Sequence, residues 1–387
     1  MSELSYLEKL LDGVEVEWLP LSGLARIRNG KDHKSLSEGE FPVYGSGGIM
    51  RYVDTYAYNK PSVLIPRKGS LGNLFFVNVP FWTVDTIFYT EIDEAQIRPK
   101  YLYYFLTTVG LGEMNQAGGV PSQTQSVLNK LKIPIPCPGN PQKSLAIQSE
   151  IVRILDKFTA VTAELTAELN MRKKQYNYYR DQLLSFDEEQ EKPIYLEKLL
   201  DGVEVEWLPL SDLARIRNGK DHKSLSEGEF PVYGSGGIMR YVDTYAYNKP
   251  SVLIPRKGSL GNLFFIDVPF WTVDTIFYTE IDEAQIRPKY LYYFLSTVGL
   301  GEMNQAGGVP SQTQSVLNKL KIPIPCPDNP EKSLAIQSEI VRILDKFDTL
   351  TNSITEGLPR EIELRQKQYE YYRDLLFSFP KPETISN

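Results

Sequence analysis

Apolar positions follow two different patterns along this chain. Between residues 14 and 136, short apolar runs bounded by Gly, Pro and Asn, such as SVLIP (62–66), NLFFVNV (73–79) and DTIFYTEI (85–92), predict β-strands. The apolar spacing of KYLYYFL after Pro99 predicts a short helix, and SQTQSVLNKL (122–131) predicts a second one. These elements together predict a compact α+β domain with many loops.

A second, helical pattern begins at NPQKSLAIQSEI (140–151), where Asn140 and Pro141 suit the start of a helix. Apolar residues then recur every three or four positions, as in the seam of a coiled coil. A helix over residues 145–186 would span about 60 Å at ~1.5 Å per residue, which suits a spacer. The predicted seam consists of Ile147, Ile151, Ile154, Phe158, Val161 and Leu165.

Most of the chain is written twice. Tyr6–Phe158 recurs as Tyr195–Phe347, and the likeness returns at QYNYYRDQLLSF (175–186) and QYEYYRDLLFSF (368–379). A repeat of this length predicts two separate domains with equivalent surfaces. Six substitutions distinguish the long copies: Gly23/Asp212, Val77/Ile266, Asn78/Asp267, Thr107/Ser296, Gly139/Asp328 and Gln142/Glu331.

The second copy has its own helical seam, which Gly357 and Pro359 should interrupt. Its predicted residues are Ile336, Ile340, Ile343, Phe347, Leu350 and Ile354. A core helix packed on its own domain is one interpretation of each seam. Pairing of the two long helices with each other is favoured, because neither half holds another helix of matching length.

The repeat predicts a division of the chain into five parts. A first domain over 1–144 is followed by a spacer helix over 145–186 and an acidic linker over 187–194. A second domain over 195–333 then precedes a second spacer helix and C-terminal tail over 334–387.

Composition narrows the class of protein. No apolar run is long enough for a membrane span, and the N-terminus lacks the features of a secretion signal. The two cysteines, Cys137 and Cys326, occupy equivalent positions, and such sparse use favours a reducing cytoplasm. A net charge of −7 argues against indiscriminate binding of polyanions. Residues 23–70 nevertheless carry eight Lys or Arg against four acidic residues, so we expect one basic face.

Catalytic motifs are missing from the sequence. The two histidines, His33 and His222, are copies of one position, which argues against a metal cluster or a histidine-based triad in either half. The chain contains no Walker-type nucleotide motif and neither the Asn-Pro-Pro-Tyr nor the Phe-x-Gly-x-Gly motif of adenine methyltransferases. We therefore expect recognition rather than catalysis, with no metal and no cofactor bound by the chain itself.

Three loops in each copy combine basic and amide side chains with glycine: RIRNGKDHK (26–34), IPRKGSLGN (65–73) and QAGGVPSQTQ (116–125). Arg and Lys suit phosphates and guanine edges, Gln suits adenine, and glycine lets a backbone approach a ligand closely. A solvated loop is the alternative for each residue, and the tyrosines near Tyr44 are expected in the core or on edge strands. The predicted DNA contacts are Arg28, Lys31, His33, Lys34, Ser46, Arg51, Arg67, Lys68, Ser70, Gln116, Ser122, Gln123 and Thr124, with their copies Arg217, Lys220, His222, Lys223, Ser235, Arg240, Arg256, Lys257, Ser259, Gln305, Ser311, Gln312 and Thr313.

The order of these segments resembles the specificity (S) subunit of type I restriction–modification enzymes. The likeness rests on WLPLSGLARIRNGK, FPVYGSGGI, IPRKGSLGNLFFV, SQTQSVLNKLKIPIP and IQSEIVRILDKF, and it covers nearly the whole chain. The resemblance implies an α+β fold with two target-recognition domains joined by two long helices in an antiparallel coiled coil with pseudo-twofold symmetry.

The resemblance also implies partners. A subunit of this family has no active site of its own, reads a split sequence in double-stranded DNA and holds two modification (M) subunits, which transfer methyl groups from adenosylmethionine to adenine. Restriction (R) subunits complete an ATP-dependent nuclease, so adenosylmethionine, ATP and Mg are expected on the partners.

This sequence departs from the family pattern in one respect, because its two recognition domains are nearly the same where the family has unrelated ones. Identical domains predict identical half-sites, and hence an interrupted palindrome. The alternatives are a DNA-binding repressor that acts alone, the recognition part of a fused methyltransferase-nuclease, and a carbohydrate or peptide adaptor.

Overall fold

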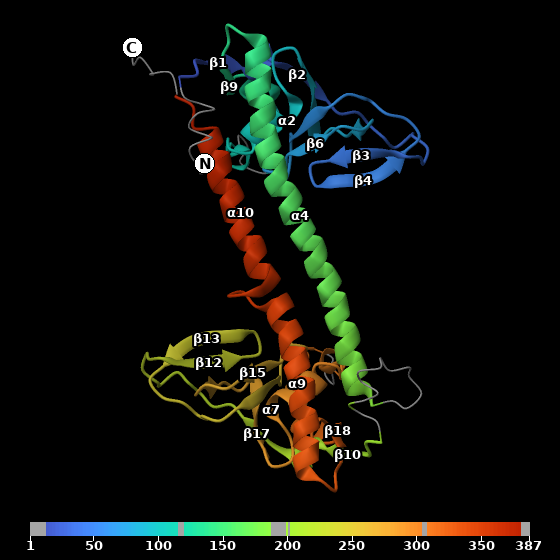
Figure 1. The fold of residues 1–387 in the computed structure, drawn as a ribbon, viewed down its shortest axis with the longest axis vertical. Coiled ribbons are helices and arrows are strands. Elements are labelled where there is room, and N and C mark those ends of the chain that lie inside the picture. Colours follow the sequence, from blue (N-terminus) through green and yellow to red (C-terminus); the bar gives the residue numbers. More distant parts are fainter. Residues whose placement is uncertain (1–12, 115–119, 187–198, 200–201, 304–307, 381–387) are drawn as a thin grey trace. The chain divides into compact units, whose positions relative to one another are not determined.

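The computed structural model describes residues 13–114, 120–186, 199, 202–303 and 308–380, and Figure 1 shows its elements in chain order. The chain divides into two units. Unit 1 comprises Met1–Leu165 and Ile362–Asn387, and unit 2 comprises Thr166–Glu361. Each unit thus combines one copy of the repeated domain with the end of the other copy's helix. Among the described helices, none has the length and hydropathy that crossing a membrane requires.

The strands of the first domain form three small sheets. β1 (Val16–Pro20) pairs antiparallel with β9 (Lys132–Pro136), which joins the beginning of the domain to its end. One antiparallel sheet has the order β2-β8-β5-β6, and another sheet has the order β4-β3-β7, with β3 and β7 parallel. The bounds are β2 Ala25–Asn29, β3 Phe41–Gly45, β4 Gly48–Val53, β5 Ser62–Pro66, β6 Phe75–Val77, β7 Trp82–Thr83 and β8 Ile87–Ile92.

The predicted strand SVLIP is the central strand β5, and all five of its residues are buried. This burial on both faces explains its continuous apolar run. The polar groups in this region are paired, since the Ser62 hydroxyl donates to the Thr90 carbonyl at 2.8 Å and the Thr90 hydroxyl donates to the Val63 carbonyl at 3.0 Å. The sheet therefore buries these hydroxyls without leaving them unsatisfied.

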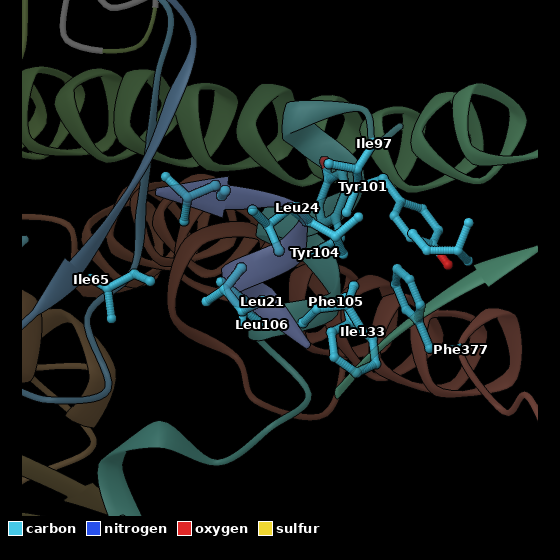
Figure 2. Close-up of a cluster of buried hydrophobic side chains, with 14 of the residues drawn as sticks. Leu21, Leu24, Ile65, Ile97, Tyr101, Tyr104, Phe105, Leu106, Ile133 and Phe377 are labelled. Atoms are coloured by element: carbon cyan, nitrogen blue, oxygen red, sulfur yellow. The ribbon is translucent and has the colours of Figure 1, made fainter. Parts of the chain in front are cut away.

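The helix predicted after Pro99 is α2 (Pro99–Leu106), and its inner face forms the core of the domain (Figure 2). Tyr101 is fully buried, and its hydroxyl donates to the Pro134 carbonyl at 2.8 Å. The second predicted helix is shorter than its pattern indicates, because only α3 (Gln125–Leu128) is helical. Two 3-10 turns, η1 (Leu21–Gly23) and η2 (Leu111–Glu113), complete the domain.

Unit 2 repeats this architecture. Its sheets have the orders β10-β18, β11-β17-β14-β15 and β13-β12-β16, each equivalent to a sheet of the first domain. The strands are β10 Val205–Pro209, β11 Ala214–Asn218, β12 Phe230–Gly234, β13 Gly237–Val242, β14 Ser251–Pro255, β15 Phe264–Ile266, β16 Trp271–Thr272, β17 Ile276–Ile281 and β18 Lys321–Pro325. The short helices are α6 Leu210–Leu213, α7 Pro288–Leu295, η3 Leu300–Glu302 and α8 Gln314–Leu317.

The predicted first spacer helix is α4 (Pro141–Ser185), a continuous helix of 45 residues. The Asn140 side chain caps its first turn by accepting from the Lys143 backbone N–H at 3.1 Å. The second copy begins in the same way, with Asn329 capping α9 (Pro330–Asn352).

The second spacer is broken, as Gly357 and Pro359 predict. α9 ends at Asn352, and α10 (Gly357–Leu376) begins after a four-residue link. Gly357 has φ of +78°, and a Cβ there would lie 2.4 Å from the Thr349 carbonyl oxygen. Only glycine fits this close approach to the end of α9.

Each domain core is completed by a helix from the other half of the chain. In unit 1, Leu376 at the end of α10 is fully buried, and Phe377 packs on Tyr101 and Phe105 with ring centroids 5.2 and 5.6 Å apart. In unit 2, Leu183 near the end of α4 is 1% exposed in the equivalent core. The first part of α4 and the last turn of α10 both pack on the first domain. The two helices therefore run in opposite directions in unit 1 (Figure 1).

An aromatic stack marks this helix pairing in both units. Phe158 of α4 stacks on Tyr372 of α10 with centroids 5.2 Å apart and an interplanar angle of 25°. Phe347 of α9 stacks on Tyr179 of α4 at 5.4 Å and 26°. The two predicted interpretations of the seam therefore both apply, since Ile147 and Ile151 pack into their own domain and Phe158 packs on the other helix.

The structure departs from the predicted seam at several positions. Leu155 and Leu344, which the predicted seam omits, are fully buried, because each domain covers a wider stripe of its helix than a coiled-coil partner does. Ile354 lies in the link after α9 and is 78% exposed, so the structure contradicts its assignment to a helix seam. Ile154, Leu165, Ile343 and Leu350 are half-buried, Val161 is 41% exposed, and Ile336 and Ile340 are buried.

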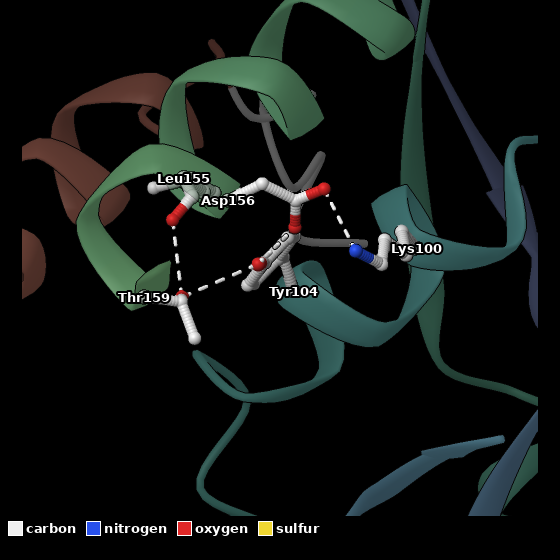
Figure 3. Close-up of polar contacts among 5 residues, drawn as sticks. All are labelled: Lys100, Tyr104, Leu155, Asp156 and Thr159. Atoms are coloured by element: carbon white, nitrogen blue, oxygen red, sulfur yellow. Dashed lines mark hydrogen bonds and ion pairs between the residues drawn. The ribbon is translucent and has the colours of Figure 1, made fainter. Parts of the chain in front are cut away.

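A group of polar side chains joins α4 to α2 (Figure 3). The Asp156 carboxylate accepts from the Lys100 ammonium at 2.7 Å and from the Tyr104 hydroxyl at 2.6 Å. Burial, reinforced by the Asp156 carboxylate, raises the pKa of Tyr104 above its ordinary value. Lys289, Tyr293 and Asp345 form the same joint in unit 2.

Candidate nucleic-acid interface

Four segments of the first domain meet at one surface, which we call the loop cluster: the β3–β4 turn (45–48) and residues 67–73, 84–86 and 121–125. The Thr86 carbonyl accepts from the backbone N–H groups of Arg67 and Lys68 at 2.8 and 3.2 Å. The Gly69 N–H donates to the Pro121 carbonyl at 2.8 Å. Loops that are far apart in the sequence are thus held together by their backbones.

The β3–β4 turn is tied to the same surface by Ser46. Its backbone N–H donates to the Thr86 hydroxyl at 3.3 Å, and its carbonyl accepts from the Asn73 side chain at 3.2 Å. Gly69 has φ of +82°, and a Cβ there would lie 3.2 Å from the Ser46 hydroxyl oxygen. The positive φ favours glycine here, and the absence of a Cβ leaves room for the Ser46 hydroxyl.

The loop at residues 30–34 extends the cluster along β7. The Lys31 N–H donates to the Thr83 carbonyl at 2.8 Å, and the Trp82 indole N–H donates to the Lys31 carbonyl at 3.1 Å. Gly30 lies so close to Val84 that a Cβ would fall 1.9 Å from the Val84 carbonyl oxygen. The backbone of this basic loop is therefore fixed, while the side chains of Lys31 and Lys34 remain exposed.

Charges on this surface are only partly paired. The Lys68 ammonium lies 4.0 Å from the Asp85 carboxylate, yet its side chain is 47% exposed. Asp32 accepts the Lys34 backbone N–H at 3.1 Å, and this hydrogen bond lowers the pKa of the Asp32 carboxyl. At this exposure, a surface ion pair contributes little to stability, so Lys68 can exchange Asp85 for a phosphate at small cost.

Two of the predicted contacts interact with other groups of their own domain. The Arg28 guanidinium pairs with Glu91 at 3.0 Å across β2 and β8, and Arg51 donates to the Leu36 carbonyl at 3.2 Å. Arg217 with Glu280 and Arg240 with Leu225 repeat these interactions in unit 2. Arg67 is half-buried, with its guanidinium over the Phe88 ring at 5.9 Å from the centroid.

The structure contradicts the prediction that Gln123 contacts a base. Its side chain is 2% exposed and donates to the Pro66 carbonyl at 2.6 Å, while its backbone N–H donates to the Arg67 carbonyl at 3.0 Å. Gln312 is placed identically, with its amide 2.5 Å from the Pro255 carbonyl. These side chains anchor the loop, because their hydrogen bonds replace water at a buried strand end.

The other predicted residues have varied positions. Ser70 and Thr124 are exposed on the cluster, and Ser46 and Ser122 are half-buried in it. His33 is half-buried, and its Nδ1 atom has no hydrogen-bond partner among the described residues. Gln116 and Gln305 lie outside the described residues. The corresponding residues of unit 2 are Lys220, His222, Lys223, Ser235, Arg256, Lys257, Ser259, Ser311 and Thr313.

The sequence prediction missed an apolar part of this surface. Ile49, Met50 and Tyr52 on β4 are 49%, 59% and 49% exposed next to the β3–β4 turn. A signal was present, because GIMRYV places two large apolar residues consecutively after a glycine turn, which a half-buried strand does not do. Tyr44 lies inward as predicted, with its ring near those of Phe75 and Phe81.

The loop clusters of the two domains have the same sequence. All six substitutions between the copies lie outside residues 30–34, 45–48, 67–73, 84–86 and 121–125 and their equivalents. Within the described residues, no group of three or more His, Cys, Asp or Glu side chains is arranged to hold a metal ion.

Comparison with known proteins assigns the family. Residues 14–172 and 202–364 each match the family described as the type I restriction modification DNA specificity domain. The Escherichia coli EcoR124I/EcoR124II specificity subunit is 42% identical over 429 residues and covers 100% of both chains. The chain belongs to the type I restriction–modification specificity subunits.

Other members of the family agree over nearly the full length. The E. coli EcoprrI specificity subunit is 36% identical over 92% of this chain and 93% of its own. A putative Haemophilus influenzae specificity subunit is 34% identical over 97% of this chain and 98% of its own. The crystal structure of a specificity subunit from M. genitalium has the same fold, with a TM-score of 0.64 at 19% identity over 96% of this chain and 98% of that chain.

Proposed function

We propose that this specificity subunit reads double-stranded DNA through its two loop clusters, one for each half of a split site. The exposed side chains of Lys31, Lys34 and Lys68 would contact phosphates, which fix position without reading sequence. The hydrogen bonds that join the four segments, and those that tie the 30–34 loop to β7, would hold these charges in one arrangement. Membership of a DNA specificity family supports this assignment.

The identity of the two loop clusters carries the second part of the proposal. None of the six substitutions falls within a cluster, so both domains would read the same short word. In each unit a domain is followed by its own helix and met by the end of the other helix. If the two spacer helices pair antiparallel over their whole length, as the family resemblance implies, equivalent domains would face opposite strands and the words would lie inverted. The proposed site is an interrupted palindrome.

We further propose that the chain acts as a non-catalytic part of a larger complex. Two M subunits would bind it and transfer methyl groups from adenosylmethionine to adenine, and R subunits would add an ATP- and Mg-dependent nuclease. A related structure, with a TM-score of 0.54 at 14% identity, comes from work on assembly of the type I restriction–modification system. The chain's own contribution would be recognition and placement of these partners.

Co-expression tests the proposal directly. Genomic adenine methylation should appear when the chain and its M subunits are present together and should be absent with either alone. Replacing Lys31, Lys34 and Lys68 by Ala, together with their equivalents in the second domain, should abolish it. Methylation that does not depend on the chain would contradict the proposal, and full sequence-specific binding by the chain alone would favour the repressor instead.

The spacing between the half-sites would follow the length of the helices. The tetrapeptide TAEL occurs at 162–165 and again at 166–169, within α4. A third copy would add about 6 Å of helix, which corresponds to about one to two base pairs at ~3.4 Å each. An insertion that leaves the gap in the methylated site unchanged would argue against this relation.

A further inference from the structure

The β3–β4 hairpin presents two consecutive apolar side chains at its tip. Cα pairing runs Val43 with Arg51 and then Tyr44 with Ile49, so Met50 is the extra residue of a β-bulge. A regular strand would turn successive side chains to opposite faces, and the bulge instead leaves Ile49 and Met50 49% and 59% exposed. Bulges of this kind re-aim side chains, often beside functional sites.

The tip is narrow, and its position is fixed. Gly47 and Gly48 have open space where a Cβ would be, so no side chain broadens the turn. Gly45 makes room for Met50, since a Cβ at Gly45 would lie 2.7 Å from the Met50 sulfur. The hydrogen bonds of Ser46 to Thr86 and Asn73 then pin the turn to the loop cluster.

Charge near the tip favours one kind of partner. Lys68 lies in the loop that Asn73 ties to the turn, and its side chain is 47% exposed. A surface that sets an apolar tip beside an exposed cation matches a duplex, which offers phosphates at the rim of a groove and apolar base faces within it. Ile and Met are among the residues that architectural proteins insert between base steps from the minor groove.

We propose that Ile49 and Met50 enter a groove of the target duplex and press against a base step, with Ile238 and Met239 doing the same at the other half-site. The equivalent tip is 50% and 58% exposed at these two residues. This inference rests on the proposed DNA-reading function and deepens it. The basic loops would supply the salt-dependent part of the affinity, and the apolar tips would supply a part that salt does not weaken.

The experiment uses the complex with its M subunits and a duplex that carries the mapped methylation site, against a duplex of scrambled sequence. A variant with Ile49→Ser, Met50→Ser, Ile238→Ser and Met239→Ser is compared with a control carrying Val79→Ser and Val268→Ser. Val79 and Val268 are 48% and 49% exposed and lie outside the loop clusters, so the control removes exposed apolar surface elsewhere on each domain. A further variant with Ile49→Val, Met50→Leu and the matching changes in unit 2 keeps the tip apolar.

The dissociation constant is measured over a range of salt concentrations. Loss of the tips should weaken binding to the specific duplex about 10- to 100-fold at every salt concentration, with the slope against log salt unchanged, because no phosphate contact is lost. The control with Val79→Ser and Val268→Ser should bind as the native complex does. So should the variant that keeps the tips apolar. The inference would be overturned if the variant with serine at both tips bound with native affinity. It would also be overturned if that variant lost no more affinity than the Val79→Ser/Val268→Ser control, or if its slope against log salt changed.

A fluorescent base reports the insertion itself. With 2-aminopurine placed in turn at each step of the half-site, native binding should raise the fluorescence at one step, and the serine variant should not. No fluorescence rise at any step with the native complex would overturn insertion. If the native complex fails to prefer the specific duplex over the scrambled one, the proposed function itself is wrong, which is a distinct result.

Discussion

The last turn of α10 should stabilise the first domain, although the two are far apart in the sequence. Leu376 is fully buried in the core of unit 1, so Leu376→Ala removes buried methyl groups and leaves a cavity. A buried Leu→Ala change costs about 2–5 kcal/mol. A loss of about 3 kcal/mol in a unit of this size lowers its melting temperature by about 6–12 °C.

Calorimetry can detect this effect because the domains are nearly identical. The native chain should show closely coincident transitions, and Leu376→Ala should move one of them to lower temperature. Leu183→Ala, at a residue 1% exposed in unit 2, should move the other transition instead. Leu364→Ala is the matched control, since Leu364 lies on α10 and is 39% exposed. Equal shifts for Leu364→Ala and Leu376→Ala, or no shift for Leu376→Ala, would refute the shared core.

Three further changes test the loop cluster and the buried tyrosines. Gln123→Ala should lower stability by about 1–3 kcal/mol in chemical denaturation, because the buried Pro66 carbonyl loses its donor, and Ser70→Ala should not. Gly69→Ala should cost about 1–2 kcal/mol, since Gly69 has φ of +82°, whereas Gly72→Ala, with open space at its Cβ, should cost less. Burial raises the pKa of Tyr101 and Tyr290 in the folded chain above the ordinary 10.0, so stability should hold below about pH 10 and fall at higher pH. The free energy of unfolding and the absorbance of tyrosinate are measured together across this pH range. A free energy of unfolding that stays constant well above pH 10 would contradict the assignment.

The sequence predicts those features that depend on local pattern. Strand β5 follows from its apolar run, the caps of α4 and α9 from Asn-Pro pairs, and the break before α10 from Gly357 and Pro359. The repeat likewise predicts two equivalent domains, which the fold confirms.

Features that depend on distant contacts could not be predicted in this way. Gln123 has a side chain suited to adenine, and only the fold shows that the Pro66 carbonyl takes its amide. The sequence pattern places the end of α9 too late for a local reason, since Ile354 keeps the heptad spacing but lies in the link before Gly357. The exposed tip at Ile49 and Met50 depends on a bulge in the pairing of β3 with β4, which the order of residues signals only weakly.

The sequence context of methylated adenines tests the central claim most directly. In cells that express this chain with its M subunits, every methylated site should contain one short word and its inverted repeat, separated by a constant gap. Two different words, or the same word repeated in direct orientation, would contradict the claim that identical domains read opposite strands.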